Sequence, residues 1–176
     1  MLVSKIIEQA VLHKREAIEE AYAKRWINEA MDTLASLYDT AKIQRNVIIT
    51  TTSEEEAVPI PTDLRRLIRI TRADKNSEIY EYVYPEIIFS QPGLRIITYL
   101  SKPVDVGAST AEPEINEAYH MILALYIASK EYAEIDPNHP KAKELMSEFY
   151  SKASVIDNDL KNLVRRSHKI PRRNWA

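Results

Sequence analysis

A proline-punctuated stretch rich in β-branched residues separates two helical stretches of this chain and limits the folds open to it. Residues 4–43 contain neither proline nor glycine, and apolar side chains recur every three or four positions from Ile27 to Ala41. That spacing gathers them on one face of a helix. From Val47 the chain turns to β-branched residues, and the period becomes that of extended strands. This order of segments predicts an α+β protein that is mainly helical.

The N-terminal segment predicts helical structure over 4–43, dominated by one long helix. Ser4 is a suitable N-cap, because its hydroxyl can accept a hydrogen bond from a first-turn amide. The charged run at 13–16 favours a break between a short helix and a longer one. It also fits the solvated face of one continuous helix, so both arrangements stay open.

The middle segment, 44–103, predicts a single small antiparallel sheet of three or four strands. Stretches rich in β-branched and aromatic residues are expected to form the strands: 47–52, 67–72, 79–84 and 94–100. Polar or Pro-Gly sequences predict the turns: 53–56, 74–77 and 91–93. Pro59 and Pro61 cannot donate a backbone hydrogen bond to a neighbouring strand, so the sequence around them is expected at an edge or in a loop.

The C-terminal segment predicts two antiparallel helices over 113–165. Pro113 suits a first helical turn, where Glu114 and Glu117 would face the positive end of the helix. The sequence at 136–140 separates the first helix from the second. Apolar residues of the second helix form one stripe: Leu145, Phe149, Ala153, Ile156, Leu160 and Leu163.

The expected fold is therefore a helical bundle with a small antiparallel β-sheet insert. The bundle comprises a long N-terminal helix plus a C-terminal helix hairpin, all in a single domain over 1–165. A basic arm over 166–176 follows it.

Composition excludes several classes of protein. The chain has no cysteine, which removes disulfide frameworks, thiolate zinc sites and cysteine nucleophiles. It has no apolar run near the roughly 18 residues needed to span a bilayer. An acidic residue at Glu8 comes too early for a signal peptide, so the protein is expected to be cytosolic at synthesis, with no membrane partner.

No catalytic motif is evident. Glu117 and His120 form a Glu-x-x-His pair, which di-iron bundles use, but such a site needs a second Glu-x-x-His and two more glutamates, and the chain has no second copy of the motif. A helical-bundle metal protein therefore stays an alternative, while a helix-start role for Glu117 and a packing role for His120 are favoured. The acidic run at 54–56 indicates a solvated turn, with a site for a cation or basic partner as the secondary interpretation. We expect no enzyme activity, cofactor or metal.

The C-terminal sequence from residue 161 to 176 is strongly basic and has no acidic residue. Its cations are Lys161, Arg165, Arg166, Lys169, Arg172 and Arg173, with Ile170, Pro171 and Trp175 among them. Such a segment fits an exposed flexible tail, an arm that orders on a protein partner, or a nucleic-acid-binding element. We favour the arm, because tryptophan and arginine commonly anchor protein interfaces.

Several short motifs occur in a fixed order between residues 25 and 163. They are Ile-Asn-Glu-Ala at 27–30, Ile-Pro-Thr-Asp-Leu at 60–64, Tyr-Leu-Ser-Lys-Pro at 99–103, Glu-Pro-Glu at 112–114, Tyr-His at 119–120, and an Asp-, Pro- and Ala-Lys-containing stretch at 136–150. This ordered set resembles the head–tail connector (adaptor, or head-completion) proteins of tailed bacteriophages. The chain departs from the family pattern in a shortened sequence at 91–95 and in its first helical stretch, up to Lys24.

The resemblance implies a structural virion protein at the head–tail junction, assembled in the host cytoplasm. Such proteins form a ring, usually dodecameric, below the portal protein. The ring extends the DNA channel and provides the attachment surface for the tail or stopper, and DNA passes through without specific binding. C-terminal segments of the family commonly reach the portal, so the expected portal-docking residues here are Arg165, Arg166, Lys169, Ile170, Pro171, Arg172, Arg173 and Trp175.

Overall fold

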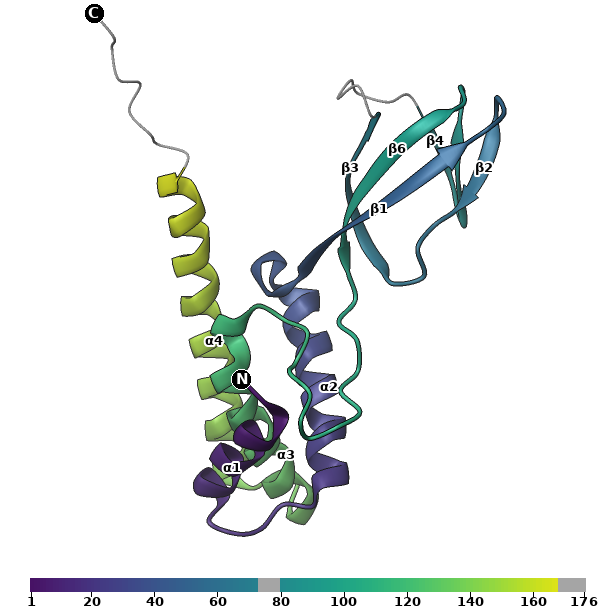
Figure 1. Ribbon diagram of the computed structural model, residues 1–176. Coiled ribbons are helices and arrows are strands. Elements are labelled where there is room, and N and C mark those ends of the chain that lie inside the picture. Colours follow the sequence, from purple (N-terminus) through teal and green to yellow (C-terminus); the bar gives the residue numbers. More distant parts are fainter. Residues whose placement is uncertain (73–79, 168–176) are drawn as a thin grey trace, which may run out of the picture. The chain divides into compact units, whose positions relative to one another are not determined.

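A computed structural model describes residues 1–72 and 80–167, with the side chains of 165–167 excepted. The chain divides into two compact units (Figure 1). The helical unit combines Met1–Lys42 with the chain from Pro103 onward, and the β unit spans Ile43–Lys102. Each unit has its own hydrophobic core.

The helical unit contains four α-helices and two short 3₁₀ helices within the described residues. In chain order they are α1 (Val3–Lys14), α2 (Glu20–Leu37), η1 (Asp39–Ala41), η2 (Glu117–Ile122), α3 (Leu123–Ile135) and α4 (Pro140–Ser167). The predicted long N-terminal helix plus C-terminal hairpin is therefore wrong as an architecture. The structure is α+β with these four helices and two sheets.

The N-terminal correction has a local cause. The chain leaves α1 at Arg15, whose φ of 67° is left-handed, so the break indicated by the charged run at 13–16 is present. Ser4 is not the N-cap, because α1 begins at Val3. The amides of Val3 and Ser4 each donate to a loop carbonyl, those of Ala111 and Ser109, at 2.9 Å. Backbone carbonyls thus do the work expected of a capping side chain.

The helix predicted from Pro113 begins only at Glu117, and first as a 3₁₀ turn. Asn116 is its N-cap, and its side-chain oxygen accepts a hydrogen bond from the Ala118 amide at 3.1 Å. Glu114 does not lie at a helix start as predicted. Its carboxylate instead accepts a hydrogen bond from the Val104 amide at 2.8 Å. These contacts hold 113–116 in an irregular loop.

Helix α3 lies at the centre of the helical unit and packs against α1, α2 and α4. Every residue from Leu123 to Ser129 is buried, which requires neighbours on all sides. Tyr126 of α3 meets Phe149 of α4 edge to face, with ring centroids 5.1 Å apart. Trp26 of α2 completes this core with only 2% of its surface exposed.

The β unit holds two three-stranded antiparallel sheets, not the single sheet predicted. The first sheet has the order β1 (Ile43–Thr51), β6 (Gly93–Ser101), β3 (Leu64–Arg72). The second has the order β2 (Glu56–Pro59), β5 (Glu86–Phe89), β4 (Tyr80–Val83). Strand β5 was not predicted. Its Ile87 and Phe89 are fully buried and form one core with Ile97 and Tyr99 of β6, so the two sheets pack face to face.

A buried arginine closes one end of this sandwich. The Arg95 guanidinium donates to the Thr51 hydroxyl at 2.5 Å and to the Gly93 and Gln91 carbonyls, and it lies 4.3 Å from the centre of the Phe89 ring. Gly93 has a φ of +148°, which L side chains rarely adopt. The predicted turn at 91–93 is thus fastened to the core by a charged side chain from the next strand.

Helix α1 is joined to α3 by a salt bridge that suits a stability test. Lys14 lies 2.6 Å from Glu131, and their side chains are only 8% and 13% exposed. The hydrogen bond to Glu131 raises the pKa of Lys14. Glu131→Gln should lower the free energy of unfolding by about 1–2 kcal/mol. The largely buried Lys14 ammonium then keeps only the more distant and exposed carboxylate of Glu16, at 3.5 Å. Urea unfolding followed by Trp26 fluorescence measures this.

The matched control is Glu134→Gln, one turn along α3, where Arg25 and Glu134 are 61% and 62% exposed. Exposed pairs contribute less than about 1 kcal/mol, so this change should be close to neutral. Equal losses for the two variants would contradict the assigned role of Glu131.

Candidate functional site

The predicted partner-binding segment begins at the end of α4. Arg165 and Arg166 lie in the last turns of this helix, while Lys169, Ile170, Pro171, Arg172, Arg173 and Trp175 lie outside the described residues. Helix α4 itself extends past α3 (Figure 1). Its predicted apolar stripe packs on the core as far as Leu160, but the last member, Leu163, is 60% exposed.

A network of hydrogen bonds lies near the point where α4 stops packing on the helical core. Lys161 donates to Asp157 at 2.6 Å, and the buried Asp157 carboxylate accepts from the Thr40 hydroxyl, also at 2.6 Å. Thr40 in turn lies 2.6 Å from the Tyr119 hydroxyl. Burial raises the pKa of Tyr119, with the Thr40 hydrogen bond acting against it. Asp157 holds this part of α4 to the rest of the unit, and Leu163 lies six residues further on, between one and two turns beyond it.

His120 is hydrogen-bonded to backbone groups through both nitrogens of its ring. Its Nε2 lies 3.1 Å from the Pro113 carbonyl and 3.2 Å from the Ile115 carbonyl, so Nε2 carries the proton and donates. Its Nδ1 accepts from the Met1 ammonium at 2.8 Å. Both ring nitrogens are therefore in use. Glu117 is exposed in the first turn of η2, directly after the N-cap Asn116, so its predicted place at a helix start is confirmed.

Metal-ligating residues do not gather elsewhere in the part of the chain that the structure describes. No group of three or more histidine, aspartate or glutamate side chains is placed to hold an ion there. His13 is exposed and His139 stacks on Tyr132 at 4.7 Å between ring centroids, so neither lies with His120 in a common site.

A surface cavity of about 400 Å³ lies between α2 and α3. It is lined by Tyr22, Arg25, Trp26, Glu131 and Glu134. Its charged groups already have partners, because Arg25 pairs with Glu134 at 3.3 Å and Glu131 pairs with Lys14. Arg25 also lies within 6 Å of both aromatic rings, at 5.7 Å and 5.8 Å. Because the charged groups of this cavity pair with each other or with Lys14, none of them is left to bind a charged ligand.

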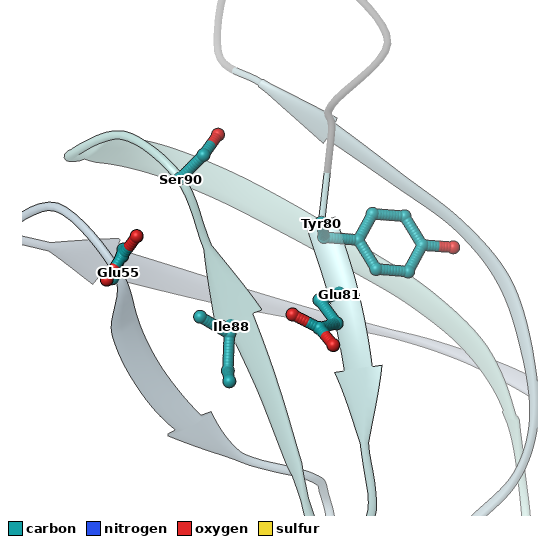
Figure 2. Close-up of a pocket in the computed structure, with 5 residues that line it drawn as sticks. All are labelled: Glu55, Tyr80, Glu81, Ile88 and Ser90. Carbon is teal, nitrogen blue, oxygen red and sulfur yellow. The ribbon is translucent and has the colours of Figure 1, made fainter.

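The β unit carries a cavity of about 440 Å³ on the second sheet. Glu55, Tyr80, Glu81, Ile88 and Ser90 line it, and the carboxylates of Glu55 and Glu81 lie on either side of Ile88 (Figure 2). Neither carboxylate forms an ion pair with any described residue. Both are exposed to water. An open acidic cavity of this kind suits a cationic side chain rather than acid–base chemistry, which favours groups removed from water.

Sequence reasoning identified this cavity only in part. The acidic run at 54–56 was predicted as a turn with a secondary role for a basic partner, and Glu55 lines the cavity. Glu56 instead turns back, and its carboxylate accepts the amides of Thr52 and Ser53 at 2.7 Å and 3.1 Å. Glu81 was missed. Only the pairing of β4 with the unpredicted β5 places it beside Ile88.

No protein-family model matches this chain, and a search of curated proteins found no match either. Among the helices in the described ranges, none combines the length and apolar character required to cross a bilayer.

The environment of His120 predicts a pH dependence of stability. Burial lowers the pKa of His120 below its ordinary value of 6.5, and the nearby N-terminal ammonium lowers it further. Below pH 6.5 the imidazole of His120 is protonated in the unfolded chain while it stays neutral in the folded chain. The stability that the neutral His120 contributes is therefore complete above pH 6.5 and is lost as the pH falls below it. Urea unfolding between about pH 7.5 and 5.5 should show the loss.

His120→Gln removes the titrating group but keeps a donor for the two carbonyls. It should flatten the pH dependence in that range, even if the variant is less stable at every pH. A slope that survives the substitution unchanged would assign the effect to another group.

Proposed function

We propose that this protein is a structural, non-enzymatic virion component, a head–tail connector of tailed bacteriophages. In this proposal it forms a ring below the portal protein at the head–tail junction. The ring extends the DNA channel and offers the attachment surface for the tail or a stopper protein. The ordered motifs between residues 25 and 163 support the assignment.

The observation that carries the proposal is the end of α4. An apolar stripe that continues beyond the body of its own unit has surface to bury on something else. Leu163 is the exposed member of that stripe, and the basic sequence that begins at Lys161 continues from it. An apolar helix face next to arginines and a tryptophan has the composition of an interface anchor.

A ring makes weak anchors sufficient. When many identical arms attach to one symmetric partner, the second and later contacts are effectively intramolecular, so avidity replaces single-site affinity. In the proposed ring the arms bind a protein and not DNA. Tight contacts with phosphates would oppose the movement of DNA through the channel. In this proposal the partner of the arm is the portal protein, as the family resemblance implies.

Portal binding provides the first test. Leu163→Asp should weaken binding to purified portal at least about tenfold, and deletion of residues 168–176 should abolish it. Val155→Asp is the control, because Val155 is also on α4 and similarly exposed, at 57%, but lies off the stripe. Light scattering of size-separated mixtures measures the complex. Only free portal and free monomer with the wild-type protein would refute the proposal.

Nucleic-acid binding by the basic segment is the competing function. It requires that deletion of residues 168–176 remove a salt-dependent affinity for duplex DNA. The connector proposal expects DNA affinity to change little on the same deletion. Fluorescence anisotropy of labelled DNA over a salt series distinguishes the two.

A further inference from the structure

The two outer faces of the β unit differ in charge. In the first sheet, Ile70, Ile97 and Tyr99 point into the shared core, so their neighbours along each strand point outward. The register pairs Ile96 with Ile48 on one side, and Thr98 with Arg69 on the other. We call the outward surface formed by Ile48, Arg66, Arg69, Leu94 and Ile96 the basic face.

Apolar and cationic side chains together make the basic face suitable for an interface. Ile48 is 68% exposed and Leu94 is 45% exposed, and the register places both on the same outward surface. Arg69 is exposed and forms no ion pair with any described residue. No aspartate or glutamate occupies an outward position on the described strands of this sheet.

The outer face of the second sheet has the opposite charge. Ile87 and Phe89 point into the core, so Ile88 points outward, and the register places Glu81 and Ala57 beside it. We call the surface formed by Glu55, Glu81, Val83, Glu86 and Ile88 the acidic face. It contains the cavity of Figure 2 and has no lysine or arginine at an outward position on the described strands.

The two faces look in opposite directions, because they are the two outer surfaces of one sandwich. We propose that copies of this protein associate head to tail, with the basic face of one β unit seated on the acidic face of the next. Arg69 of one copy enters the cavity between Glu55 and Glu81 of its neighbour, and Ile48 and Leu94 cover Ile88 and Val83.

Charge complementarity selects a second copy in this orientation. Two basic faces would set arginine against arginine, and two acidic faces would set glutamates against each other. A contact between unlike faces leaves one free face of each kind on the pair, so a third copy can add in the same way. Heterologous contacts of this type produce rings when the rotation closes. The inference deepens the proposed function, since it names the surfaces by which a connector ring would form.

Charge reversal with rescue tests the interface. Arg69→Glu alone and Glu81→Arg alone should each weaken self-association at least about tenfold in sedimentation velocity at about 50 mM salt. An equimolar mixture of the two variants should recover it, because alternating copies restore unlike charges at every contact. The double variant in one chain should also recover it. Lys5→Glu, an equal charge change at an exposed position of α1, is the control and should leave association intact.

Cysteine pairs test the contact when association is too weak to sediment. The chain has no cysteine, so an Arg69→Cys variant mixed with a Glu81→Cys variant reports only on the new thiols. On oxidation, the mixed disulfide should exceed both homodimers several-fold. A statistical mixture of the three species would overturn the interface.

The outcomes separate the two proposals. Portal binding that requires Leu163, without a mixed disulfide or charge rescue, would leave the connector function standing and reject this interface. A positive mixed disulfide in a protein that never binds the portal would retain the interface and reject the connector function.

Discussion

The helical unit depends on one helix that is buried on every side. Residues Leu123–Ser129 of α3 leave no polar face, so α3 is ordered only when α1, α2 and α4 surround it. The N-terminal and C-terminal parts of the chain must therefore meet before this core exists. The Lys14–Glu131 salt bridge and the loop carbonyls that cap α1 follow from that arrangement, because both join segments that are more than a hundred residues apart.

Several apolar surfaces of the described chain remain exposed, and they indicate where it could bind partners. The α4 stripe runs one turn past its own core at Leu163, and the β unit keeps apolar side chains on both outer faces. These surfaces carry charges of defined sign: basic sequence next to Leu163, arginines on the first sheet and glutamates on the second. Both ring nitrogens of His120, by contrast, are hydrogen-bonded to backbone groups. The proposed association would bury these uncovered surfaces.

Periodicity predicted the elements whose signals are local. The stripe of α4 and the strands around Ile70 and Ile97 follow from spacing alone. The capping of α1 by Ser109 and Ala111 does not, because these contacts join distant parts of the chain. The helix start at Asn116 is a local cap that was overlooked because Pro113 offered an earlier first-turn position. Strand β5 has only four residues, so its alternation is too short to recognise, and without it the second sheet and the position of Glu81 are hidden. Most of the predicted docking arm lies beyond the described residues.

The central claim is that this protein completes its surfaces only beside a portal and further copies of itself. Electron cryomicroscopy of assembled particles that carry the chain tests it most directly. The account predicts a closed ring of this protein between portal and tail, with the end of α4 on the portal. Particles in which the chain is absent from that junction, or is present there without contacts between copies, would contradict it.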